Sequence, residues 1–385
     1  MCAALILSLC GTVSLRAAEN APASAPADLE AAQKLTREVC EAMAHKDFAP
    51  LLDLIRKCDI RSQIIQRMPD TYPANPEERE KIAGEFMKMV ESSAPRIWAY
   101  APDAERFFLP PRDEKDALVV PVRFDFQNEQ KARVTVFQVF RYRTSPDGLR
   151  LMNIETPLAG QDVASATASL LPAHWPQLPE DNEQRRRKQA VIYAMLRGSH
   201  FEAEKAARAA LKESPDDWVF RTTLAGALIS MRKYDDAREV YRDMLARGQA
   251  VLFAHYQLAT LDIAQEHYDE AIPHLQTVLD GLGEDDWILT QLANARMLAG
   301  KTTDAKVTLE RALKVNPFSH YALEKRAKLR IQEGDLDGAA ADLRTIKAHG
   351  GLNILALLKD ADFSKLVLME KYGDILDRPS EPKAP

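Results

Sequence analysis

The sequence predicts two kinds of fold in one chain: an α+β domain first, then an all-α solenoid of helix-turn-helix repeats. Two observations support this prediction. Between residues 118 and 156 apolar side chains alternate with a period of two, as in β-strands. Farther along, alanines recur with a constant 34-residue period from Ala203 to Ala339. A glycine content of 15 in 385 residues also favours a helix-rich chain.

The chain begins with an uncharged, largely apolar stretch from Met1 to Leu15, followed by small residues at Ala17 and Ala18. Such a stretch is too short to span a bilayer but suits the apolar region of a secretory signal peptide. We therefore expect residues 1–18 to be a signal peptide. The protein would then be exported to a periplasm or the extracellular space, without stable membrane insertion after processing. A lipidated N-terminus and a buried N-terminal helix of a cytosolic protein stay open as alternatives.

Residues 19–28 are rich in Ala, Pro and Ser and are expected to be a disordered spacer. The α+β domain is predicted to cover residues 29–160. Its helices are expected over residues 29–44 and 48–60, and a third helix begins at Asn75, with this side chain as the cap and proline in the first turn.

Three β-rich runs follow, over residues 118–126, 132–143 and 149–156, and predict an antiparallel sheet. Helices followed by a curved sheet are similar, in order of elements alone, to the cystatin-like and nuclear-transport-factor-2-like folds. Prolines are frequent over residues 161–183, which we expect to be a linker.

Five 34-residue repeat units are predicted over residues 184–351. One column of the repeat is alanine throughout: Ala203, Ala237, Ala271, Ala305 and Ala339. Twelve residues earlier a second column holds small residues: Val191, Ala225, Ala259, Ala293 and Ala327. Small side chains at these places let two antiparallel helices approach closely. Five residues before the alanine, a glycine or a charged residue marks the turn between them.

The segments 232–237 and 266–271 (RKYDDA and EHYDEA) resemble the turn and second-helix start of a tetratricopeptide repeat. The resemblance implies a solenoid that binds a protein or peptide on its concave side. The three middle units have leucine where the first unit has Ala190 and the last has Arg326, which we attribute to end repeats that face water on one side.

Residues 352–378 are expected to form capping helices, and residues 379–385 a loose tail. In these helices Asp362 is the predicted cap. One apolar stripe follows it: Phe363, Leu366, Met369 and Tyr372.

The candidate binding site is a ladder of rings spaced one repeat apart, Phe253, Trp287 and Tyr321. The resemblance implies that this column borders the groove. Further members of the candidate site lie about one turn along: Tyr256, Gln257, Thr290, Gln291 and Asn294. Rings offer contact area with little rotamer entropy to lose, and amides can pair with a peptide backbone. The alternative is that the rings pack against the preceding unit.

Other classes of function find little support. A net charge of −6 argues against a nucleic-acid partner. No glycine-rich phosphate loop, HExxH, GxSxG or paired CxxC occurs in the sequence, so no catalytic, cofactor or metal site is predicted. Glu270 and His274 could ligate a metal, but a solvated helical pair is the simpler interpretation. Cys40 and Cys58 could form a disulfide or stay separate thiols.

The sequence therefore predicts a non-enzymatic, exported adaptor whose repeats bind a protein or peptide. An alternative is a carrier that holds a small apolar ligand in the α+β domain. Its candidate lining is a set of rings that alternate along the strands: Phe124, Phe126, Phe137, Phe140 and Tyr142. Ordinary core packing is the simpler role for these rings.

Overall fold

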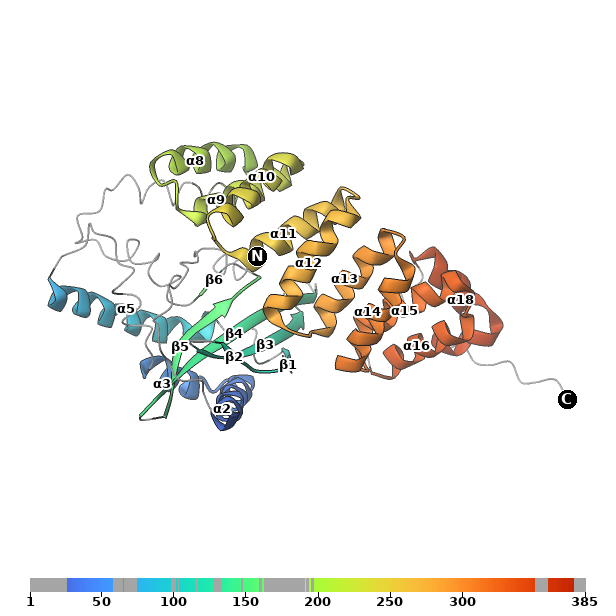
Figure 1. Cartoon of the computed structure of the whole chain (residues 1–385), viewed down its shortest axis with the longest axis horizontal. Helices are drawn as coiled ribbons and strands as arrows, with labels where there is room; N and C mark the ends of the chain where they lie inside the picture. The colour runs from blue at the N-terminus through green and yellow to red at the C-terminus, as the bar shows by residue number, and fades with distance from the viewer. Residues whose placement is uncertain are drawn as a thin grey trace. The chain divides into compact units, whose positions relative to one another are not determined.

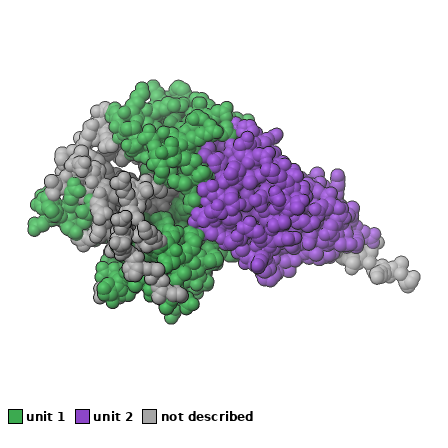
Figure 2. Space-filling model, in the orientation of Figure 1, with its two compact units in different colours: residues 1–257 green, residues 258–385 purple. Residues whose placement is uncertain are grey.

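The computed structural model of the chain describes residues 26–57, 65, 75–97, 102, 104–114, 117–127, 133–146, 148–158, 161–162, 191, 194, 197–349 and 359–376. The expected signal peptide, residue Cys58, most of the expected linker and the expected tail lie outside these ranges. The chain divides into two compact units, residues 1–257 and 258–385 (Figure 2). Their boundary falls inside helix α11 (Val251–Ala264).

Three helices of the first domain are α2 (Pro26–Ala44), α3 (Ala49–Arg56) and α5 (Pro76–Ile97). Helix α2 begins at Pro26, so the last three residues of the expected spacer are helical instead of disordered. Proline is tolerated there because the first helical N–H groups have no intrahelical partner. Helix α5 starts as predicted, since the Asn75 side-chain oxygen accepts a 3.0 Å hydrogen bond from the Glu77 backbone N–H.

The sheet is antiparallel in every pairing, and its three long strands confirm the predicted β-rich runs. The strand order is β1–β3–β4–β5–β6, with β2 also paired to β3. The strands are β1 (Glu105–Phe108), β2 (Arg112–Glu114), β3 (Ala117–Gln127), β4 (Arg133–Ser145), β5 (Gly148–Thr156) and β6 (Gln161–Asp162). Strand β6 occupies the first two residues of the expected linker, which corrects that boundary.

One face of the sheet forms the core of this domain with the helices (Figure 1). Leu118, Val120 and Phe140 are buried there among residues of α2 and α3. The Tyr142 hydroxyl and the Thr36 hydroxyl of α2 form a buried hydrogen bond of 2.8 Å, which ties the helix to the sheet. Cys40 is a free thiol in the same core.

The repeat helices follow the predicted 34-residue frame (Figure 1). Besides α11 they are α8 (His200–Glu213), α9 (Trp218–Ser230), α10 (Tyr234–Ala246), α12 (Tyr268–Leu282), α13 (Asp286–Leu298), α14 (Thr302–Val315), α15 (His320–Glu333) and α16 (Leu336–Ala348). The members of both small-residue columns, from Val191 to Ala339, have fully buried side chains, 0% exposed. The columns therefore lie where the helices cross, as predicted.

The turn within each unit has the same backbone conformation whatever its residue. The φ angles are +71° at Gly198, +58° at Arg232, +63° at Glu266, +72° at Gly300 and +83° at Gly334. All lie in the left-handed region, which favours glycine. The repeat thus imposes this turn even on an arginine and a glutamate.

Two elements close the array, α18 (Ala361–Leu368) and the 3₁₀ helix η2 (Glu370–Leu376). The cap of α18 is Asp360 and not the predicted Asp362, because the Asp360 carboxylate accepts from the backbone N–H groups of Asp362 and Phe363. Met369 is also no part of a buried stripe: it ends α18 and is 44% exposed. The other three residues of that stripe, Phe363, Leu366 and Tyr372, are buried.

Candidate functional site

Helix α13 presents one stripe of side chains to solvent. Trp287, Gln291 and Asn294 are half-buried, and Leu298 is exposed. Their successive spacings of four, three and four residues place them along one face of a helix. Most residues between them, such as Leu289, are buried, whereas Arg296 and Met297 are half-buried. The stripe therefore consists of one ring, two amides and one leucine on one face of α13.

The start of α13 fixes the place of Trp287. The Asp285 carboxylate accepts 3.0 Å hydrogen bonds from the backbone N–H groups of Trp287 and Ile288. Such a cap satisfies donors that have no partner within the helix. Farther along the stripe, Gln291 and Asn294 form no side-chain hydrogen bond with any residue that the structure describes. Their amides are therefore open to a partner.

Helix α15 carries the next ring of the predicted ladder. Tyr321 is half-buried, and its ring lies 3.8 Å from the His320 ring. Helices α13 and α15 are packed against each other within the second unit. Trp287, Gln291 and Asn294 thus lie on one helix and Tyr321 on the helix packed against it.

The other predicted site residues are placed differently. Phe253 is 9% exposed, and its ring meets the Tyr241 ring edge-on at 5.9 Å, which fits packing against the preceding helix. Thr290 is 2% exposed, and its hydroxyl donates to the Asp286 carbonyl oxygen at 2.6 Å. Tyr256 and Gln257 are half-buried on α11 and belong, with Phe253, to the first unit.

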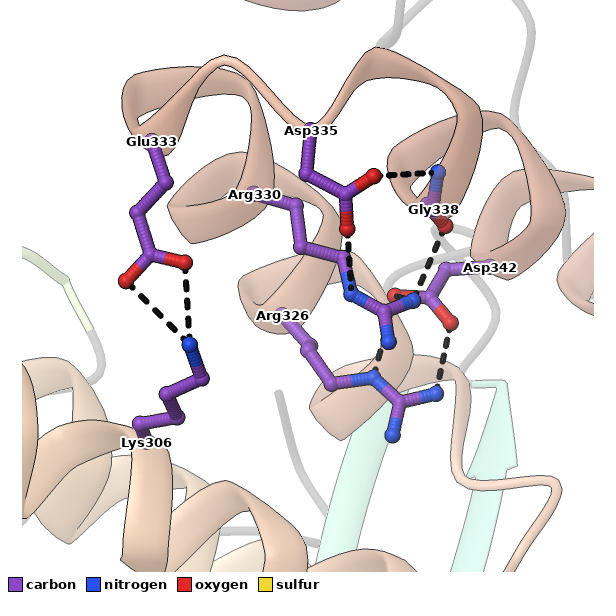
Figure 3. A network of polar contacts seen from close by, with 7 residues as sticks. All are labelled: Lys306, Arg326, Arg330, Glu333, Asp335, Gly338 and Asp342. Atoms are coloured by element: carbon purple, nitrogen blue, oxygen red, sulfur yellow. Dashed lines mark hydrogen bonds and ion pairs between the residues drawn. The ribbon is translucent and has the colours of Figure 1, made fainter.

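A charged network holds α15 to α16 (Figure 3). Arg326 donates to the two Asp342 carboxylate oxygens at 2.6 and 3.0 Å, and Arg330 donates to the same carboxylate at 2.9 Å. Asp342 is 3% exposed. The structure gives Arg326 a role that the sequence-based reason did not include: this side chain, 26% exposed, pairs with a buried carboxylate.

The residues considered for metal binding do not assemble a site. His274 Nε2 lies 3.9 Å from Asp262 Oδ2, within one repeat. Among the described residues no group of three or more His, Cys, Asp or Glu side chains could hold a metal ion. In the same part of the chain, no helix combines the length and apolar character needed to cross a membrane.

The rings of the first domain mainly fill its interior. Phe124, Phe140 and Tyr142 are 0% exposed within the core beneath α2, and Phe126 is packed against it. Burial raises the pKa of the Tyr142 hydroxyl. Phe137 points to the other face of the sheet and is also fully buried. In this structure these five rings are packing residues.

That other face also carries a buried ion pair that sequence analysis missed. Arg123 Nε lies 3.4 Å from Asp125 Oδ2, with both side chains at most 2% exposed. The Phe107 ring stacks on the Arg123 guanidinium at 4.0 Å, and the Thr135 hydroxyl donates to Asp125 at 2.8 Å. The available signal was that Arg123 and Asp125 alternate with apolar residues along β3. If both faces of the strand are buried, two such charges are expected to pair with each other.

Comparison with known proteins supports the repeat assignment. The family model described as "Tetratricopeptide repeat" matches residues 194–259 and 262–329. These residues are tetratricopeptide repeats, an architecture that serves as a protein-interaction scaffold. No curated protein matches the chain.

Two solved structures are similar to part of the chain at low sequence identity. MamA (41-end) from Desulfovibrio magneticus RS-1 shows 15% identity and a TM-score of 0.40, covering 45% of this chain and 98% of that one. A tetratricopeptide repeat protein from Parabacteroides merdae shows 15% identity and a TM-score of 0.45, covering 51% and 78% respectively.

Proposed function

Because residues 194–259 and 262–329 are tetratricopeptide repeats, we propose that this protein is a non-enzymatic scaffold that binds a peptide segment of a partner protein. The binding surface is the stripe of α13, Trp287, Gln291, Asn294 and Leu298, together with Tyr321 of α15. The observation that carries the proposal is the composition of this stripe. A half-buried tryptophan and an exposed leucine, with two amides between them that form no side-chain hydrogen bond with a described residue, offer apolar contact and hydrogen bonds to a backbone.

Trp287→Ala tests this surface. We expect peptide affinity to fall by about 2 kcal/mol or more, as for an interface anchor, with a small change in melting temperature. The matched control is Phe253→Ala, because Phe253 stands one repeat earlier in the same column but is buried. This variant should lower stability far more than affinity per folded molecule. Binding and melting are measured on the full chain by calorimetry. A folded Trp287→Ala protein with undiminished affinity would disprove the site.

We also propose that the protein is exported, on the support of the uncharged apolar stretch over residues 1–15 and the small residues after it. Mass spectrometry of the N-terminal peptide of the native protein should give a mature start between Ala18 and Ala23. A native protein that still carries Met1 would contradict export by this route.

A further inference from the structure

One basic side chain of α15 differs from the others. Among its four basic residues, Arg326 and Arg330 bind Asp342, and Lys328 binds Asp360 at 2.8 Å. Lys325 forms no ion pair with any residue that the structure describes, although its side chain is half-buried. Structural requirements of the fold therefore explain three of the four charges and leave one.

Lys325 lies on the proposed binding surface. It follows Tyr321 by four residues, one helical turn, and stands one full repeat after Gln291, at the same place in its unit. The preceding residue, Glu324, leaves the helix about 100° away and faces another direction. The stripe of α13 itself contains no charge. A second cation, Lys328, stands one repeat after Asn294 but is paired with Asp360. Lys325 is thus the cation here that no described carboxylate neutralises, at one side of a surface of rings and amides.

The spacing between the two helices limits the partner. Packed helices have axes about 8–10 Å apart, and an extended chain advances about 3.3 Å per residue. A segment that crosses from Trp287 to Lys325 therefore needs about three residues for that distance. An extended segment fits better than a helix, because the amides of Gln291 and Asn294 can bond only to backbone groups not already paired.

We propose that the partner segment is an extended acidic peptide, with an apolar side chain for Trp287 and a carboxylate about three residues away for Lys325. This inference rests on the proposed function and adds the chemistry of the partner. The ammonium attracts the carboxylate, and the half-buried setting of Lys325 limits screening by water and salt. Lys325 then determines specificity, while Trp287 supplies contact area.

The test is selection of peptides from a displayed random library on the full chain, on Lys325→Glu, on Lys325→Arg and on Trp287→Ala. The native chain should enrich peptides with Asp or Glu about three residues from an apolar residue. Lys325→Glu should enrich Lys or Arg there instead, and Lys325→Arg should keep the acidic preference. For one selected peptide, replacing its acidic residue by lysine should weaken binding to the native chain about fivefold and strengthen binding to Lys325→Glu.

The outcomes separate the two proposals. Apolar peptides enriched without any charge preference, and equally by Lys325→Glu, would overturn the acidic partner and leave the binding surface standing. Peptides bound equally well by a folded Trp287→Ala protein would overturn the surface itself. Melting temperatures of all variants, measured beside the selections, establish that each protein tested is folded.

Discussion

The helix pairs α13–α14 and α15–α16 share one 34-residue frame but are joined by different chemistry. In the first pair Leu292 is fully buried, and Arg296 donates to the hydroxyl of Thr308. In the second pair the corresponding residues are Arg326, Arg330 and Asp342, which form the charged network of Figure 3. Leucine and threonine have thus been exchanged together for arginine and aspartate. The 34-residue frame determines which two positions come into contact. The residues at these two positions differ together between the two repeats, apolar with hydroxyl in one and arginine with aspartate in the other.

Removing the carboxylate is expected to have the largest effect on this comparison. Asp342→Ala leaves two arginines without their acceptor, and we expect it to lower the free energy of unfolding of α15–α16 by about 3 kcal/mol. The arginines are 26% and 27% exposed, so water can partly replace the carboxylate. The matched change in the other pair, Thr308→Val, should cost about 1 kcal/mol. Native-state hydrogen exchange of both helix pairs measures the difference, and equal losses would contradict it.

Moving the charges into the other pair tests the coupling between the two positions, whose expected energy is smaller than the loss in Asp342→Ala. Leu292→Arg alone puts a cation into a buried apolar place and should strongly destabilise α13–α14. Adding Thr308→Asp should recover about 1–2 kcal/mol, because the new carboxylate lies where Asp342 lies in the next repeat. A double-mutant cycle by hydrogen exchange gives the coupling. Additive losses would show that the frame alone does not place the two side chains together.

The smallest expected effect is a loss of stability of α16 and η2, the C-terminal elements, at low pH. Hydrogen bonds from Arg344 lower the pKa of Asp374, and hydrogen bonds from Lys371 and Tyr372 lower the pKa of Asp337. A lowered pKa means that these carboxylates stabilise the fold at neutral pH. That contribution is lost as the pH falls below about 4, through the lowered values.

Hydrogen exchange of η2 at neutral pH and at about pH 3 measures this loss. Asp374→Asn is the control, since it removes one titrating group and should reduce the difference between the two conditions. An unchanged acid response in this variant would show that the loosening arises elsewhere.

The sequence predicts more of the repeats than of the first domain. In the repeats a fixed period predicts which residues cross, and Ala271 and Ala305 are fully buried at the expected places. The role of Arg326 was missed because its partner Asp342 stands 16 residues later, and a column of small residues does not show which polar residues meet. Asp360 was missed as a cap because Asp362 has the same side chain and lies two residues away.

The first domain has no repeated unit that would predict all of its elements. Its long strands show alternation over many residues, whereas β2 has three residues and β6 has two. Runs that short carry no recognisable pattern, and only pairing with β3 and β5 makes them strands. Likewise, the stripe of α13 could be predicted for Trp287, but Lys325 stands out only when the partners of Arg326 and Lys328 are known.

The left-handed turns at Arg232 and Glu266 have a consequence for how this array can change over generations. A side chain with a Cβ costs about 1 kcal/mol or more in that conformation, whereas glycine adopts it freely. The units of Arg232 and Glu266 therefore bear a local conformational cost. The other three units avoid it, because they have glycine at this position. The packing of the helices on either side offsets this cost, because both turns keep the left-handed conformation. Arg232→Gly and Glu266→Gly would therefore remove a local cost without changing the frame of the repeat.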